Sequence, residues 1–159
     1  MTSQKYQKLI LNMVNFYTIF NIEFDDLIPD LSNSEVTPLL SKILNVIHME
    51  GTTTASFLSK KLNISVPNTS RSINTLNLAG YIIKKQDSMD KRIIYLSLSQ
   101  KAMELISKTI NASEEIFSKR FDVLSNEEIE QLIYSFSTIQ NMLIKMRDSN
   151  NNNKKSWKK

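Results

Sequence analysis

The chain has 159 residues, of which 41% are hydrophobic, and this is enough to build the core of one compact domain. It holds no cysteine and only one histidine, which excludes disulfides and thiolate chemistry and argues against a His-rich metal site. The net charge of +4 is unevenly distributed, because residues 51–98 carry +5 between the negative segments 1–50 and 99–150. A basic middle segment favours binding to a polyanion, although a solvated basic face explains the charge equally well.

Long helices are expected, because only two glycines and three prolines interrupt the chain. Apolar residues at helical spacing predict a first helix over residues 5–28, ended by Pro29. A second apolar series over residues 39–47 predicts another helix, which Gly51 would cap at its end.

The start of this second helix has two interpretations. Ser32 and Glu35 could form a capping box, but Pro38 would then lie too deep in the helix. Thr37 as the N-cap, with Pro38 at the first helical position, avoids that clash.

Two shorter helices follow. The threonines at 52–54 can cap the first, with Ala55, Leu58 and Leu62 facing inward, and the turn at residues 63–65 leads into the second. Pro67 is tolerated in the first turn of that second helix, and Gly80 ends it. Its buried side is expected to hold Val66, Ile73 and Leu76, with Thr69 and Ser70 beside them, and its opposite side Asn68, Arg71, Ser72 and Thr75.

The pattern then changes to that of strands. Residues 81–85 and 92–98 are rich in β-branched and aromatic side chains and predict a β-hairpin with an exposed tip over 86–91. From Ser99 the chain returns to helix, and residues 125–128 form a capping box that opens the last helix. These two helices carry apolar stripes made of Met103, Leu105, Ile106, Ile110, Ile116, Phe117, Phe121, Ile129, Leu132, Ile133, Phe136, Ile139, Leu143 and Met146.

The order helix, short helix, turn, helix and hairpin predicts a mainly α (α+β) winged helix-turn-helix. The polar side of the second short helix suits a major groove, because arginine can bond guanine, asparagine adenine, and hydroxyls bases or phosphates. Such a side is also often only solvated, but folding alone gives the hairpin no reason to be basic. The candidate DNA contacts are Asn68, Thr69, Ser70, Arg71, Ser72 and Thr75 on the helix and Lys84, Lys85, Asp90, Lys91 and Arg92 on the hairpin.

The hairpin also carries a family resemblance. Residues 87–92, Asp-Ser-Met-Asp-Lys-Arg, and residues 96–99, Leu-Ser-Leu-Ser, resemble the wing signature of the MarR family of bacterial regulators. That signature is roughly D-P-x-D-x-R, followed by an apolar strand ending in Leu-Thr. Ser88 departs from it where proline is usual, and Ala102 stands where glycine is common.

Other segments extend the resemblance to about residues 31–146. Residues 70–71 and 76–81 resemble the family's T-R…L-x-x-x-G-hydrophobic pattern, and residues 124–136 resemble its C-terminal helix. The organisation implied is one domain over residues 1–148, with the DNA-binding region at about 37–98. Its dimerisation helices are expected at about 1–30 and 99–148, and a disordered basic tail at 149–159.

The resemblance assigns roles to the charged residues. Arg92 would reach the minor groove from the wing, Asp90 would hold that arginine by a charge-assisted hydrogen bond, and Arg71 would enter the major groove. A surface ion pair of little consequence is the alternative for Asp90 and Arg92. The family's habit also implies a homodimeric repressor on a palindromic operator, although the apolar stripes could instead cover the monomer's own core.

Members of the family often bind small aromatic or amphipathic effectors, and Phe16, Tyr17, Phe20 and His48 would line such a cavity here. Alternatively, the three aromatic side chains only pack in the core, and His48 lies near the C-terminal end of a helix because its charge is favourable to the helix dipole there. No cofactor or metal is expected, and a cytoplasmic location is expected because no stretch approaches the ~18 apolar residues of a membrane span. An enzyme is not expected, because no phosphate-binding Gly loop or nucleophile–base set is recognisable. The competing function is a winged-helix module that docks on another protein without touching DNA.

Overall fold

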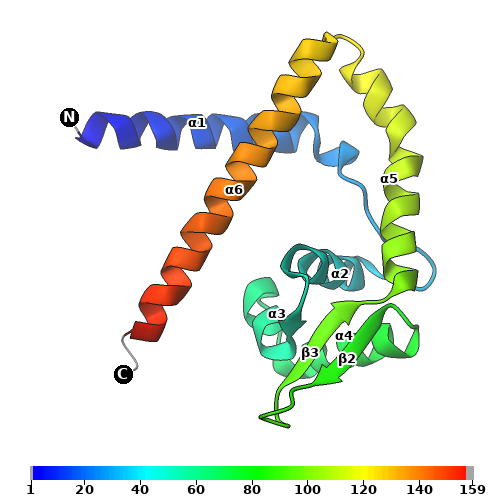
Figure 1. Cartoon of the computed structure of the whole chain (residues 1–159). Coiled ribbons are helices and arrows are strands. Elements are labelled where there is room, and N and C mark those ends of the chain that lie inside the picture. Colours follow the sequence, from blue (N-terminus) through cyan, green and yellow to red (C-terminus); the bar gives the residue numbers. More distant parts are fainter. Residues whose placement is uncertain (1, 157–159) are drawn as a thin grey trace. The chain divides into compact units, whose positions relative to one another are not determined.

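The computed structural model describes residues 2–156 and the side chains of residues 4–149. The chain divides into two compact units, Met1–Glu114 and Glu115–Lys159. The architecture is mostly helical with one small antiparallel sheet (Figure 1), which confirms the fold class predicted from the sequence.

The first helix, α1 (Thr2–Glu23), ends earlier than its apolar spacing predicts. A 3-10 turn, Asp25–Leu27, follows it and buries the Leu27 side chain. Ile28 then has extended backbone, with φ −68° and ψ 115°, as expected for a residue before a proline. The prediction of a continuous helix to residue 28 is therefore wrong in its last turn, where the chain tightens to bury a leucine.

The second helix, α2 (Pro38–Glu50), begins as the second interpretation of the sequence predicts. Thr37 is the N-cap, proline is the first helical residue, and Gly51 ends the helix with φ +68°. Ser32 is not a cap, because its hydroxyl donates instead to Asp30 Oδ1, at 2.9 Å, within the preceding loop.

Helices α3 (Ala55–Leu62) and α4 (Val66–Leu78) form the helix-turn-helix. The hydroxyls of Thr54 and Ser65 cap them by accepting backbone amides of the first turns. Between them Asn63 adopts the left-handed conformation, with φ 52°, which asparagine tolerates better than most residues do. Both helices therefore begin and end at residues suited to those positions.

The sheet has three strands in the order β1-β3-β2. The hairpin of β2 (Ile82–Gln86) and β3 (Ile94–Leu98) confirms the predicted one, and we call residues 82–98 the wing. The edge strand β1 (Thr53–Thr54) was not predicted from the sequence. It has only two residues, and its strand character comes entirely from pairing with β3.

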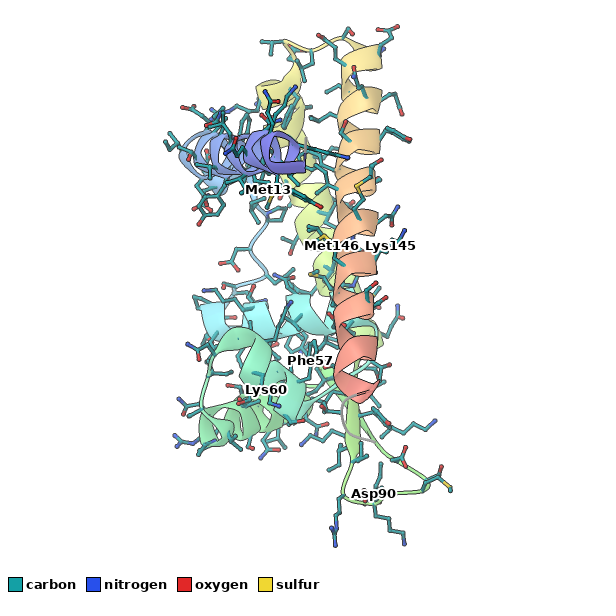
Figure 2. All side chains as sticks on the ribbon, turned by 90° about the vertical axis from the view of Figure 1, so that its left-hand side faces the viewer. Met13, Phe57, Lys60, Asp90, Lys145 and Met146 are labelled. Atoms are coloured by element: carbon teal, nitrogen blue, oxygen red, sulfur yellow. The ribbon has the colours of Figure 1, made fainter. Side chains whose placement is uncertain are left out.

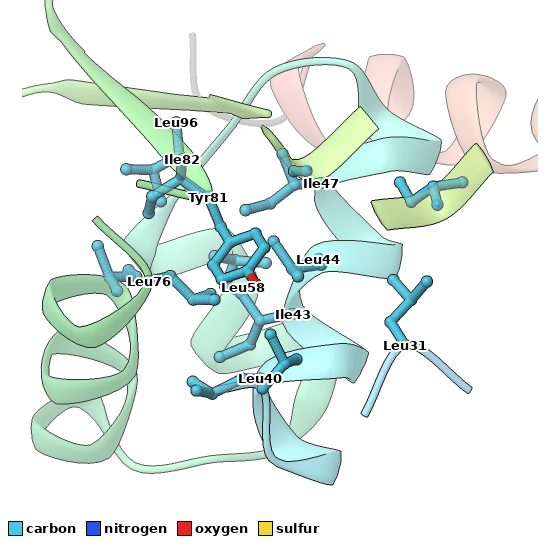
Figure 3. Close-up of a cluster of buried hydrophobic side chains, with 14 residues drawn as sticks. Leu31, Leu40, Ile43, Leu44, Ile47, Leu58, Leu76, Tyr81, Ile82 and Leu96 are labelled. Carbon is cyan, nitrogen blue, oxygen red and sulfur yellow. The ribbon is translucent and has the colours of Figure 1, made fainter. Parts of the chain in front are cut away.

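One hydrophobic core joins α2, α3, α4, the sheet and the first turns of α5 (Gln100–Phe121) (Figure 3). The side chain of Ala102 is fully buried in it, so a methyl group fits where the family pattern has glycine. The other core side chains are Leu31, Val36, Leu40, Ile43, Leu44, Ile47, Leu58, Ile73, Leu76, Tyr81, Ile82, Leu96 and Ile106.

The last helix, α6 (Asn126–Ser156), opens with the predicted capping box. The Glu128 carboxylate accepts the Ser125 amide at 2.8 Å, and the Ser125 hydroxyl accepts the Glu128 amide at 3.3 Å. The helix continues to Ser156, into the segment for which composition predicts disorder, since no glycine or proline ends it. The last three residues of the predicted tail lie outside the described residues.

Candidate nucleic-acid interface

The buried side of α4 consists of Thr69, Ser72, Ile73 and Leu76, a spacing of three and four residues that forms one helical stripe. Thr69 is 1% exposed and its hydroxyl donates to the Ser65 carbonyl at 3.0 Å. Ser72 is 8% exposed. The prediction that these two side chains contact DNA is therefore not supported by their burial, and the placement of Ser72 on the outer side is wrong. Ser72 lies next to Leu76 around the helix, not opposite it.

The exposed side of α4 is centred on Arg71 and Asn74, with Asn68, Ser70 and Thr75 at its margins. Asn74 was missed by the sequence reasoning, although it lies three residues after Arg71 and so shares its side of the helix. Val66, predicted to be buried, is 66% exposed because the first turn of α4 extends beyond the core. Ser70, placed beside the buried residues as well as among the DNA contacts, is exposed and so available for contact.

The two lysines of β2 lie on opposite faces of the sheet, because successive strand residues alternate. Lys84 pairs with the buried Leu96, and its ammonium reaches α4, where it donates to Asn74 Oδ1 at 2.6 Å. Lys85 pairs with Tyr95 and lines a separate hollow of about 450 Å³ on the other face. Only Lys84 is thus placed beside the exposed side of α4.

The tip of the wing is held together by two aspartates. The Asp87 carboxylate accepts the amides of Met89 and Asp90, both at 2.8 Å, and these bonds hold its pKa below the ordinary value of 3.8. Asp90, at the end of the hairpin in Figure 2, accepts the backbone amide of Arg92 at 2.9 Å. The Gln86 amide group donates to the Lys91 carbonyl at 2.6 Å. The motif therefore builds the turn itself.

Arg92 is positioned differently from what the family resemblance implies. Asp90 bonds its backbone amide, not its guanidinium, so the predicted charge-assisted pair is wrong. Within residues 4–149 no other side chain bonds the guanidinium. Arg92 instead lines an open hollow of about 610 Å³ between the start of α3, the start of α4 and β3, together with Ser56, Val66 and Ile94. An exposed guanidinium at the rim of a groove is available to an external anion.

The residues predicted to bind an effector do not share one described site. Phe16 and Tyr17 are exposed on α1, where the Phe16 and Phe20 rings lie with centroids 5.6 Å apart. His48 is exposed in the last turn of α2. The described residues contain no cluster of three or more potential metal ligands among His, Cys, Asp and Glu. No helix in the described part of the chain is both long and apolar enough to cross a membrane.

Comparisons with known proteins agree with this geometry. The MarR family model matches residues 36–94, which include α2, the helix-turn-helix and most of the wing. The HTH-type transcriptional regulator YkoM of Bacillus subtilis is 25% identical over 124 residues, covering 76% of this chain and 80% of that protein.

Two solved structures show the same fold. A mutant of MepR from multidrug-resistant S. aureus gives a TM-score of 0.69 at 19% identity, covering 82% of this chain and 96% of the other. A mutant of E. coli MarR complexed with operator DNA gives a TM-score of 0.50 at 19% identity, covering 82% and 94%. Proteins of this family are regulators and not enzymes, in agreement with the expectation from the sequence. This chain therefore has the winged helix-turn-helix fold of these solved structures, and over residues 36–94 it is similar to the MarR family of transcriptional regulators.

Proposed function

We propose that this chain binds duplex DNA as a homodimer, with α4 in the major groove and the wing against the minor groove. The observation that carries the proposal is the pairing of two basic elements in one compact unit. The exposed side of α4 presents Arg71 and Asn74, and the wing presents the guanidinium of Arg92. Both aspartates of the wing tip accept backbone amides of that tip, so they build the turn that presents Lys91 and Arg92.

The contacts divide by what each residue can read. Arg71 can bond a guanine edge bidentately, which gives sequence preference. Asn74 keeps its amide NH₂ for a base acceptor, because its oxygen must face Lys84, which has only donors. Arg92 and Lys91 supply positive charge to the backbone and the minor groove. Asn68, Ser70 and Thr75 stay candidates for bases or phosphates.

Dimerisation is proposed because two helices expose apolar stripes that the winged helix does not need. On α1 the exposed side chains include Leu9, Ile10, Met13, Val14 and Tyr17, and on α6 Ile133, Ile139, Met142, Leu143 and Met146. Apolar surface repeated at helical spacing is expected to be covered by another helix. A two-fold dimer would present two copies of α4 to half-sites about one helical turn apart. Sedimentation should therefore give twice the chain mass, and Leu143→Glu should shift it toward the monomer.

We propose that operator binding represses transcription and that a small aromatic or amphipathic effector releases the protein from DNA. The relatives support a regulator, whereas repression and effector release rest on the habit of the family. A cytoplasmic location likewise stays a prediction.

Selection of bound sequences from random duplex DNA tests the main proposal with the full chain. We expect enrichment of a palindrome whose half-site centres are about 10 base pairs apart, and affinity that falls steeply with salt. A winged helix that only docks on another protein would enrich no sequence, and that outcome would overturn the proposal.

A further inference from the structure

A polar cluster joins the loop before α2, the link between α4 and β2, and the start of α5, and the DNA-facing residues do not account for it. We call Glu35, Tyr81 and Lys101 the Lys101 cluster. The Tyr81 hydroxyl donates to Glu35 Oε2 at 2.7 Å, and the Lys101 ammonium donates to the same oxygen at 2.8 Å. The Tyr81 ring is buried among the core side chains (Figure 3), and the Lys101 ammonium lies 4.2 Å from its centroid. The Lys101 ammonium thus lies against the Tyr81 ring and also bonds the carboxylate to which the Tyr81 hydroxyl donates.

The cluster also holds the link between α4 and the wing. The Lys101 ammonium donates to the Ala79 carbonyl at 2.9 Å, just beyond the end of α4, where a cation is favoured by the helix dipole. The Ser99 hydroxyl donates to the Gly80 carbonyl at 2.6 Å, and the Ser99 amide to the Tyr81 carbonyl at 3.0 Å. Three consecutive residues of the link are therefore bonded to the start of α5.

This link needs such support, because Gly80 has φ +79° and little intrinsic preference for one conformation. Any rotation at this point would turn α4 relative to the wing, since only two residues separate Ala79 from the first residue of β2. The contacts span 46 and 66 residues of sequence, so they join elements that local folding does not join.

We propose that Lys101 is a positioning residue for DNA recognition, which fixes α4 and the wing on α5. This inference rests on the proposed function, because α5 leads into the helices that would form the dimer. In a dimer, the angle between α5 and α4 sets the distance between the two reading helices. The cluster thereby sets which half-site spacing the protein accepts.

The test uses the full chain with Lys101→Met, which removes the ammonium and keeps an aliphatic side chain. Lys119→Met is the matched control, because Lys119 also pairs with a glutamate, Glu115, at 2.6 Å, but within α5 alone. Binding is measured on the selected palindrome and on versions with half-sites one base pair closer or further apart. We expect Lys101→Met to reduce the preference for the best spacing about tenfold, with Lys119→Met unchanged. Lys101→Arg should retain most of the preference.

A second measurement does not depend on DNA. Amide hydrogen exchange of Gly80 and Tyr81 in the free protein should be about tenfold faster in Lys101→Met than in the control. Unchanged exchange and unchanged spacing preference would overturn the positioning role. If the wild-type chain selects no DNA sequence, the proposed function fails, and exchange alone decides whether Lys101 fixes the link. If Lys101→Met does not fold, Glu35→Ala removes the carboxylate that accepts from both Lys101 and Tyr81, and it is judged by the same two measurements.

Discussion

Replacing Arg92 by alanine should separate DNA binding from folding. The backbone amide of residue 92, which donates to Asp90, is kept in Arg92→Ala, and no described side chain loses a bond to the guanidinium. The free energy of unfolding should therefore change by no more than about 0.5 kcal/mol. The loss of one arginine contact to DNA should cost about 1–3 kcal/mol, or about 5–150-fold in affinity. A dimer loses the contact on both wings, so the two losses together should cost about 2–6 kcal/mol, or about 30-fold or more in affinity.

Fluorescence anisotropy with the selected operator, repeated over a range of salt concentrations, measures this effect. Arg92→Ala should also make the dependence of affinity on salt less steep. Lys108→Ala is the matched control, because it removes one exposed positive charge from α5, outside the wing and α4. Equal affinity of Arg92→Ala and wild type, with both folded, would refute the assignment of the wing. A loss that is matched by Lys108→Ala would show only an effect of net charge.

Three further outcomes are expected. Leu76 is a fully buried residue of α4, so Leu76→Ala should lower the free energy of unfolding, measured by urea denaturation, by about 2–5 kcal/mol. A loss below about 1 kcal/mol would contradict the packing of Leu76 in the core. Arg71→Ala should relax sequence preference more than Lys84→Ala does, measured by repeating the site selection, and equal losses on all sequences would count against Arg71 as a base reader. The carboxyl of Asp87 should titrate below 3.8 by NMR, because it accepts two backbone amides of the wing tip. Because the pKa of Asp87 is lowered in the folded state, its ionised carboxylate stabilises the tip at pH values above the ordinary pKa. This contribution is lost as the pH falls through the lowered pKa. An ordinary pKa for Asp87 would contradict the turn geometry.

The starts of several helices and the wing could be predicted from sequence because short-range rules determine them. Thr37 and Ser65 cap helices by bonding amides three residues away, and the pair Ser125 and Glu128 does so reciprocally. The change from helical to alternating spacing located the hairpin within two residues of its observed strands. The DNA contacts, the dimer and the effector stay predictions.

Contacts between distant segments decided the remaining features. Ser72 is buried and Asn74 is exposed because of how α4 packs against its neighbours. The spacing of apolar residues alone did not fix the rotation of α4 about its own axis to better than about one residue. The motif that contains Asp87 and Asp90 was recognised from the sequence, but the donors that these two carboxylates accept became known only from the structure of the turn.

The sequence by itself determined that this chain carries a helix-turn-helix followed by a basic wing, because caps, breakers and spacing act over a few residues. Only the tertiary structure decided which side of α4 faces outward, that Thr53–Thr54 forms a strand, and that Lys101 bonds Glu35. These depend on partners tens of residues away, whose proximity follows from the packing of one shared core and has no signature in the local pattern.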